Sequence, residues 1–375
     1  MSTHRKSRAW MEIRADALRH NLARIRAAVG AGVRLVPMVK ADAYGLGVAG
    51  AVKALEAEKP WGFGVSTVGE GVALRQMGVV RPVLVLSPTP PGSAADAVEA
   101  GLTLSISSLP ALDALRTAAA GRPADFHLEV DTGMGRAGFD WRDAGAWRDA
   151  VRDAHGAGVR WAGCFTHLHS ADEDEASVHV QWRRFQETLS ASALPEGDFL
   201  VHALNSAGAL RCPQYAADAV RPGIFLYGGG IGEDLPEPEE VASVRARVVH
   251  VRPAVTGTTL GYGSTYRSTA DERWATVAIG YGDGLPRALG NRGFALVRGR
   301  RVPIVGRISM DVTVVDISGV ADVAPGDVVT FVGRDGEARI PVDEVARLVG
   351  TISYEILTGF TPRLERVWSE GDGGS

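Results

Sequence analysis

Between Val33 and Val220, short apolar runs alternate with amphipathic segments of helical period, and this alternation limits the folds open to the chain. Alternating strands and helices are typical of a parallel sheet, because a parallel connection needs a crossover. Eight such units fit a closed (β/α)8 barrel of the TIM type, and an open doubly wound sheet is the alternative. The eight runs are Val33–Val39, Trp61–Val65, Val83–Leu86, Leu102–Ile106, Phe126–Val130, Val159–Thr166, Phe199–Ala203 and Ala217–Val220.

From about Val241 the apolar pattern shortens to that of strands separated by glycine-rich turns, which indicates a mostly β domain. We therefore expect a barrel of residues 1–236 and a β-rich domain of residues 237–375, with the first ~10 residues able to pack on the second domain. The strand-like segments are Arg245–Val248, Trp274–Ile279, Phe294–Val297, Val302–Val305, Val312–Ile317 and Val328–Val332.

Composition narrows the functional class. The 375 residues are 45% hydrophobic and 22% charged, which is typical of a globular protein with ample core. A net charge of −4 disfavours a nucleic-acid or anionic-membrane partner. Cys164 and Cys212 are too few for a disulfide framework or a zinc cluster. No apolar run follows Met1–Arg14 as in a signal peptide, so we expect a cytoplasmic protein without a structural metal.

Lys40 ends the first apolar run, and Tyr44 follows four residues later among glycines. A lysine at the end of a buried strand is costly to desolvate. Its amine, kept partly neutral, can attack a carbonyl to form a Schiff base, and pyridoxal phosphate is the commonest partner in that chemistry. The alternative is a structural lysine whose ammonium group extends to solvent.

Polar residues follow several other runs as well. Asp131–Arg136 come after the fifth run, His167 and His169 after the sixth, Asn205 and Ser206 after the seventh, and Arg221–Gly223 after the eighth. In a barrel these positions share the carboxyl-terminal face. The pattern therefore predicts one site at that face.

Motifs along nearly the whole chain, from the first helix to Arg363, resemble alanine racemase, a pyridoxal-phosphate enzyme. The resemblance implies the barrel and β-domain plan, interconversion of L-alanine and D-alanine, and D-alanine supply for peptidoglycan. It also implies a homodimer whose two active sites are shared between subunits. The motifs are Lys40 with Ala43-Tyr44-Gly45, residues 130–138, Arg221–Ile224 with Tyr227-Gly228, Gly261-Tyr262-Gly263, residues 280–284, residues 306–311 and residues 352–355.

Racemisation removes the α-proton from one face of the substrate and returns a proton on the other, so two acid/base groups are needed. The resemblance assigns these roles, on a pyridoxal-phosphate aldimine, to Lys40 and to Tyr262 of the partner subunit. His167 then bonds that tyrosine and Arg221 bonds His167. Arg221 also faces the pyridine nitrogen. Because arginine keeps its proton, we infer that the ring stays a weak electron sink and the reaction is confined to proton exchange.

The remaining roles also follow from the resemblance. Pyridoxal phosphate would be held by Lys40, Tyr44, His167, Asn205, Ser206, Arg221, Gly223, Ile224 and Tyr354. The substrate carboxylate would meet Arg136, Met310 and Asp311. The entrance and subunit interface would be lined by Asp172, Tyr281, Arg287 and Arg307.

Glu129 departs from the family pattern, in which many members carry a carbamylated lysine beside the arginine that matches Arg136. Glutamate cannot be carbamylated, but it supplies a carboxylate on a shorter stem. We therefore expect Glu129 to orient Arg136 directly through a charge-assisted bond.

Other enzymes share this plan. Related amino-acid decarboxylases place a glutamate at the pyridine nitrogen, so Arg221 speaks against them. A broad-specificity racemase acting on serine or lysine stays open, because side-chain selectivity depends on pocket shape. A non-catalytic pyridoxal-phosphate-binding barrel would keep Lys40 but would not need Tyr262 or Met310.

Overall fold

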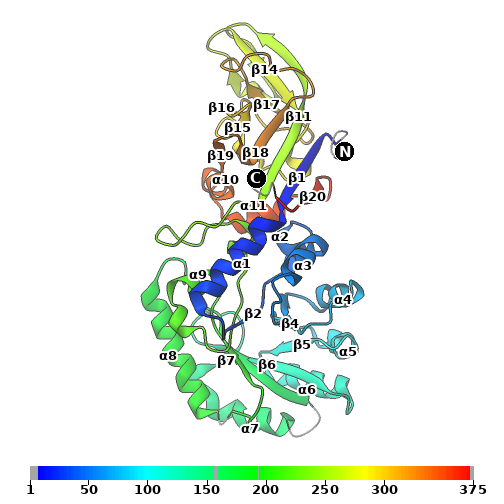
Figure 1. Cartoon of the computed structure of the whole chain (residues 1–375), viewed down its shortest axis with the longest axis vertical. Helices are drawn as coiled ribbons and strands as arrows, with labels where there is room; N and C mark the ends of the chain where they lie inside the picture. The colour runs from blue at the N-terminus through cyan, green and yellow to red at the C-terminus, as the bar shows by residue number, and fades with distance from the viewer. Residues whose placement is uncertain (1–6, 156–158, 193, 372–375) are drawn as a thin grey trace.

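The chain folds into a barrel and a β-rich part, which lie one above the other along the long axis of the molecule (Figure 1). A computed structural model describes residues 7–155, 159–192 and 194–371. Within these residues every helix is too short or too polar to span a lipid bilayer.

The barrel sheet confirms the expected (β/α)8 plan. Among the described residues, eight parallel strands follow one another in the order β2-β10-β9-β8-β6-β5-β4-β3, and the short β7 pairs with β6. The circle closes just beyond β2, where Met38 forms a parallel bridge to Gly64 of β3. The strands are β2 (Arg34–Leu35), β3 (Phe63–Val65), β4 (Val83–Val85), β5 (Thr103–Ile106), β6 (Ala124–Asp131), β7 (Phe139–Asp140), β8 (Val159–Phe165), β9 (Leu200–His202) and β10 (Ala219–Val220).

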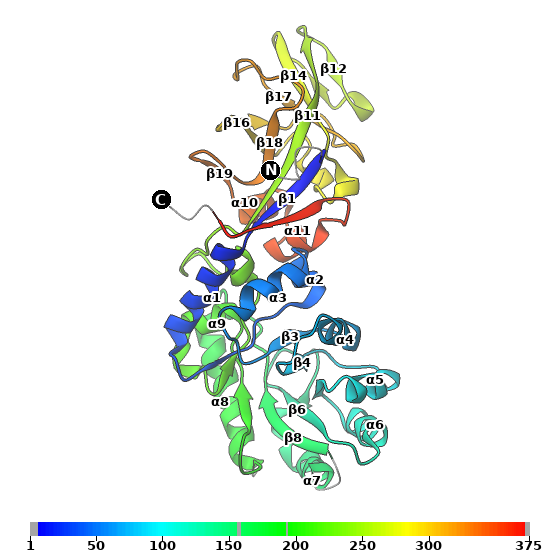
Figure 2. The same ribbon diagram turned by 45° about the vertical axis from the view of Figure 1, so that its right-hand side comes forward.

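Helices cover the outside of this sheet, and α4, α5 and α6 lie along one side of it in Figure 2. Because the strands are buried on both faces, they read as continuous apolar runs. The helix α4 begins at a capping box in which Thr67 and Glu70 bond each other's backbone N–H groups. The helices are α1 (Ala15–Val29), α2 (Lys40–Tyr44), α3 (Val48–Glu56), α4 (Val68–Gln76), α5 (Ala94–Glu99), α6 (Leu109–Ala119), α7 (Ala144–His155), α8 (Glu175–Ala191) and α9 (Ser206–Arg211).

A second, mostly antiparallel sheet forms the β-rich part, in the order β16-β15-β18-β11-β1-β20 with β14, β17 and β19 attached. The first strand of the chain, β1, lies here, antiparallel to β11 and parallel to β20. The elements are β1 (Ala9–Arg14), β11 (Ala242–Ala254), β12 (Thr259–Leu260), β13 (Tyr266–Arg267), β14 (Glu272–Val277), β15 (Phe294–Val297), β16 (Arg300–Pro303), β17 (Thr313–Asp316), β18 (Val328–Asp335), β19 (Ala338–Ile340), α10 (Val342–Val349), α11 (Ser353–Gly359) and β20 (Glu365–Ser369).

The two parts meet around α2 and α11. Arg366 of β20 donates to the carbonyl of Gly45 with Nε at 3.0 Å and Nη2 at 2.9 Å. The same guanidinium donates to the carbonyl of Phe360, just after α11, at 2.7 Å. The last strand of the chain therefore supports the segment that follows the first barrel strand.

Candidate active site

A cavity of about 390 Å³ opens at the carboxyl-terminal ends of the barrel strands. The structure brings together here the residues for which the sequence predicts contact with the cofactor or its neighbours. Those that line the cavity are Lys40, Tyr44, Glu129, Arg136, His167, Asn205, Ser206, Arg221, Gly223, Ile224 and Tyr354.

Lys40 opens a short turn of unusual hand. Four successive residues without the freedom of glycine, Ala41 to Tyr44, have φ between 52° and 56°. Left-handed backbone costs about 1–2 kcal/mol per residue for L-amino acids. Such a run persists only where its surroundings impose it.

Contacts from three elements hold this turn. Glu70, at the start of α4, accepts from Ala41 N–H through Oε1 at 2.7 Å and from Ser66 N–H through Oε2 at 2.8 Å. Asp42 accepts from the backbone of Val48 at 2.7 Å. Together with the Arg366 bonds to Gly45, these contacts fix where Lys40 and Tyr44 point.

The Lys40 amine lies in an environment that favours its neutral form. Burial lowers the lysine pKa most, the cations Arg136 and Arg221 lower it further, and only Glu70 opposes them. A lysine with a lowered pKa is the nucleophile that Schiff-base chemistry needs.

Small and hydroxyl-bearing groups form one wall of the cavity. The Tyr44 ring stacks on Tyr227 with centroids 4.6 Å apart, and Ser206 Oγ accepts from Gly223 N–H at 2.8 Å. A Cβ at Gly223 would lie 2.2 Å from the Tyr44 hydroxyl, so only glycine leaves this space open. With Tyr354 also lining it, the wall has the hydroxyl donors and the close backbone that a phosphate group needs.

Asn205 lines the cavity as predicted and also caps a helix. Its side chain caps α9 by accepting from Gly208 N–H at 2.9 Å. It lines the cavity, while its carbonyl oxygen serves the helix that carries Ser206.

Arg221 also lines the cavity and is the centre of a buried network. Its Nη1 donates to His202 Nδ1 at 2.6 Å, and its Nη2 lies 2.9 Å from the carbonyl of Thr166 and 3.3 Å from His167 Nδ1. Burial lowers the Arg221 pKa to about 10. The guanidinium therefore keeps its proton at neutral pH and only donates.

Because Arg221 only donates, the chain of protons beyond it is determined. His202 accepts at Nδ1, so its own proton is on Nε2, which lies 2.7 Å from Nδ1 of His127. Burial, with Arg221 as the next cause, lowers the pKa of His167 to about 3 and that of His202 well below its usual value. Burial lowers the pKa of His127 to about 3 as well. All three imidazoles are neutral at pH 7.

The direct bond expected between Glu129 and Arg136 is absent. The buried Glu129 carboxylate accepts instead from Ser107 Oγ at 2.6 Å. In the described part of the chain no ion pair within 4.0 Å joins Glu129 to Arg136. The short glutamate stem ends at the neighbouring strand, so Arg136 acts on Glu129 only through its field, which lowers the Glu129 pKa against the larger raising effect of burial.

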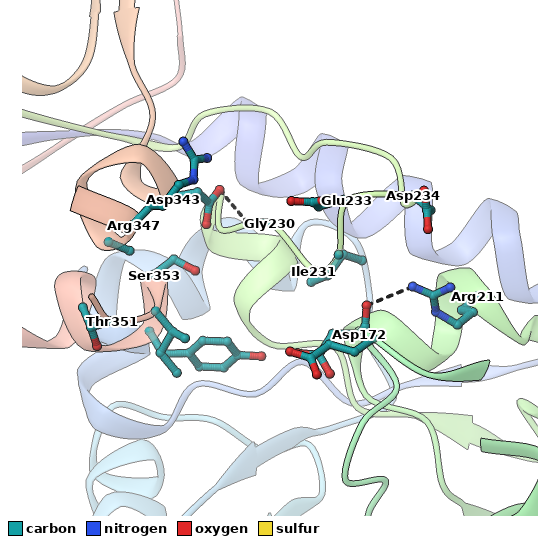
Figure 3. A pocket seen from close by; sticks show the side chains of 15 residues that line it. Asp172, Arg211, Gly230, Ile231, Glu233, Asp234, Asp343, Arg347, Thr351 and Ser353 are labelled. Carbon is teal, nitrogen blue, oxygen red and sulfur yellow. Dashed lines mark hydrogen bonds between the residues drawn. The ribbon is translucent and has the colours of Figure 1, made fainter. Parts of the chain in front are cut away.

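A second cavity, of about 530 Å³, lies between the barrel and the C-terminal helices (Figure 3). Asp172, predicted at an entrance, lines this cavity, and Tyr354 lines both cavities. Arg211 donates to the carbonyl of Asp172 at 2.9 Å, and Asp343 accepts from Gly230 N–H at 2.9 Å.

The remaining predicted residues lie away from both cavities. Tyr262 is 72% exposed, Met310 52% and Tyr281 41%, although all three are large apolar side chains. Asp311 pairs with Arg363 at 2.7 Å. Arg287 and Arg307 are exposed on the same part of the chain. One chain alone therefore does not bring these residues to Lys40.

Sequence reasoning missed several residues of the site. His202 and His127 receive no role at the site from the sequence, although His202 ends a barrel strand and that position is itself a signal. Ser107 follows β5 and Tyr227 lies within a motif, but neither had a predicted contact. The described residues contain no cluster of three potential metal ligands.

Known proteins match over almost the entire chain. The family description "Alanine racemase, N-terminal domain" matches residues 13–230, and "Alanine racemase, C-terminal domain" matches residues 241–368. The alanine racemase of Desulfosudis oleivorans is 37% identical over 380 residues, which is 97% of either chain.

Solved structures agree. The alanine racemase of Clostridium difficile 630 has a TM-score of 0.91 and 30% identity, covering 98% of this chain and 97% of its own. That of a D-cycloserine-producing Streptomyces lavendulae has a TM-score of 0.92 and 31% identity, covering 97% and 98%. With both domain descriptions matched and these similarities at full length, the chain belongs to the alanine racemase family.

Proposed function

We propose that this protein interconverts L-alanine and D-alanine with pyridoxal phosphate, as a homodimer with shared active sites. The observation that carries the proposal is the single cavity in which Lys40, with its lowered pKa, faces the Arg221 network and the Tyr44–Ser206–Gly223 wall. A D-alanine supply for peptidoglycan and a cytoplasmic location stay predictions, which growth on D-alanine and cell fractionation would test.

The residues present fit the cofactor. Lys40 would hold it covalently, the hydroxyls of Tyr44, Ser206 and Tyr354 would meet its phosphate, and Arg221 would meet its ring nitrogen. When bound, pyridoxal phosphate withdraws electrons from an attached amino acid and so makes its α-proton acidic.

The chain's own residues then exchange the proton. Lys40 Nζ, released from its covalent role, takes or returns it on one face of the substrate, because its lowered pKa keeps part of the amine neutral. The phenol of Tyr262 of the partner subunit serves the other face. Two bases on opposite faces exchange protons without either one moving around the substrate.

Arg221 limits the side reactions that compete with proton exchange. Its guanidinium keeps its proton at neutral pH and donates a hydrogen bond without protonating its acceptor. The neutral His202 and His127 behind it add no positive charge. Arg221 therefore favours return of the proton over reactions that need a stronger electron sink.

The homodimer is supported by exposure. Tyr262, Met310 and Tyr281 are large apolar side chains that are exposed to solvent in the single chain. Exposed apolar groups of this size in one region are typical of an interface. A second copy that covers them would complete the site around Lys40.

The deciding experiment is conversion of L-alanine by the pyridoxal-phosphate-loaded protein, with L-serine and L-lysine in parallel and Lys40→Ala as control. We expect alanine-selective conversion that is lost in the control. Conversion of lysine at an equal rate would move the assignment to a broad-specificity racemase. Bound cofactor without conversion of any of the three would contradict catalysis.

A further inference from the structure

A buried carboxylate lies beneath the exposed loop that carries Met310. The Asp283 side chain is fully buried at 0% exposure. It accepts from Arg8 Nη2 at 2.5 Å, from Gly280 N–H at 2.9 Å, and lies 3.2 Å from Arg363 Nε. A buried charge with two cationic partners is costly to assemble and is weak evidence for a stabilising role.

Both arginines that contact Asp283 also contact the loop itself. Arg363 Nη2 pairs with Asp311 Oδ1 at 2.7 Å, and Arg8 Nη1 donates to the Asp311 carbonyl at 3.2 Å. Segments from the start, the middle and the end of the chain thus meet at one carboxylate. Their shared contact is the loop of residues 309–311.

The backbone beside Asp283 is hydrogen-bonded to the same loop. Tyr281 N–H donates to the Ser309 carbonyl at 3.0 Å and Gly282 N–H to the Met310 carbonyl at 2.8 Å. A Cβ at Gly280 would lie 2.2 Å from the Ser309 oxygen. The contact is therefore close enough to require glycine, and the conformation of the loop is fixed.

The loop of residues 309–311, which this network holds, does not contribute to the cavity of its own chain. Met310 is 52% exposed, and neither it nor Asp311 lines the cavity around Lys40. A rigid support beneath exposed residues has a use only where another molecule meets them.

We propose that Asp283 and Arg363 are positioning residues that hold the loop of residues 309–311 in the shape it presents to the active site of the partner subunit. The proposal rests on the proposed homodimeric function. It assigns to two residues with no predicted role the alignment of the substrate-carboxylate contacts across the interface.

The test compares Asp283→Asn and Arg363→Met with the wild type for KM and kcat toward L-alanine. We expect KM to rise about tenfold, because misplacement of a contact group by a fraction of an ångström is enough for this, with kcat changed less than about threefold. Arg363→Lys should recover part of the affinity. The control Arg298→Met removes an arginine that pairs with Asp327 at 2.9 Å and lies in the turn between β15 and β16, and it should leave both constants unchanged.

A mixed dimer separates positioning across the interface from a local defect. Asp283→Asn chains are combined with Lys40→Ala chains, whose own homodimers are inactive. Each mixed dimer then has one site with an intact Lys40 and an intact Asp283 on the opposite subunit. We expect the KM of these sites to return to the wild-type value.

The outcomes are distinct. A KM that stays raised in the mixed dimer places the effect of Asp283 within its own chain and overturns the proposal, as do unchanged constants in folded Asp283→Asn and Arg363→Met. A wild-type protein that is monomeric by light scattering, or that does not racemise alanine, overturns the proposed function instead.

Discussion

The barrel and the β-rich part prepare their candidate residues in opposite ways. Around Lys40, the barrel residues are buried and bonded to one another: Arg221 alone contacts His202, His167 and the Thr166 carbonyl. In the β-rich part, Tyr262 and Met310 are exposed, and the bonded groups of the Asp283 network lie beside Met310. The single chain thus buries one group of candidate residues and leaves the other group exposed, so under the proposed homodimeric function the active site is complete only after assembly.

The largest effect is expected when a chain that lacks Lys40 is paired with a chain that lacks Tyr262. Lys40→Ala and Tyr262→Phe homodimers should each lose racemase activity, because each lacks one of the two bases. Dimers reassembled from an equal mixture should recover roughly a quarter of wild-type activity, since half of the dimers are mixed and each has one complete site. Recovery is measured by D-alanine formation, and no recovery would place both bases in the same chain.

The barrel network gives the next largest effect. Arg221→Glu replaces five donors by acceptors facing the Thr166 carbonyl, and we expect turnover to fall by about 10²-fold or more, with a rise in aminated cofactor as side product. Absorbance of the cofactor during turnover measures the side product. Arg221→Lys, which keeps the charge, is the matched variant. Unchanged side-product levels in both variants would contradict the role of Arg221.

Replacing the buried Glu129 of the barrel should have opposite effects on stability and on activity. Glu129→Gln keeps an acceptor for Ser107 but removes the one carboxylate that lines the cavity among the residues that the structure describes. We expect KM for alanine to rise about tenfold, since Arg136 and Arg221 lose their counter-charge. Equal KM values in both proteins at pH 7 would contradict this.

The expected effect of Glu129→Gln on folding stability follows from the raised pKa of Glu129. Burial raises the Glu129 pKa, so the folded chain disfavours the ionised form. Below the ordinary glutamate pKa of about 4.3 both states hold the proton and no penalty exists. As pH rises above that value the wild type loses stability relative to Glu129→Gln, until the raised pKa is passed. Thermal unfolding of both proteins between pH 4 and pH 8 measures the difference.

The smallest effect concerns the left-handed turn. Ala41→Gly relieves a residue with φ of 52°, and we expect a gain of up to about 1 kcal/mol in unfolding free energy. The matched Ala23→Gly, on the exposed face of α1, should cost about 0.5–1 kcal/mol. Denaturant unfolding compares them. A loss at both positions would show that the turn is not strained.

The sequence predicts the barrel strands well, but it does not predict the contacts that fix the side chains of the site. The eight apolar runs each coincide with a barrel strand, because a strand buried on both faces carries its signal in its own residues. The left-handed turn could not be foreseen, since Ala41 and Ala43 are good formers of ordinary helix and the hand is imposed by Glu70 and Arg366. The predicted bond from Glu129 to Arg136 was wrong because the sequence does not show which neighbouring strand the Glu129 side chain reaches, and its carboxylate accepts from Ser107 instead.

The dependence of the Lys40 turn on Arg366 has a consequence for the order of events during synthesis. Arg366 lies in β20, the last strand of the chain, and supports the carbonyl of Gly45. The barrel strands all emerge from the ribosome well before it. A nascent chain can therefore form its barrel strands well before Arg366 is available to support the turn that begins at Lys40, so this amine takes its final orientation only after β20 has been synthesised.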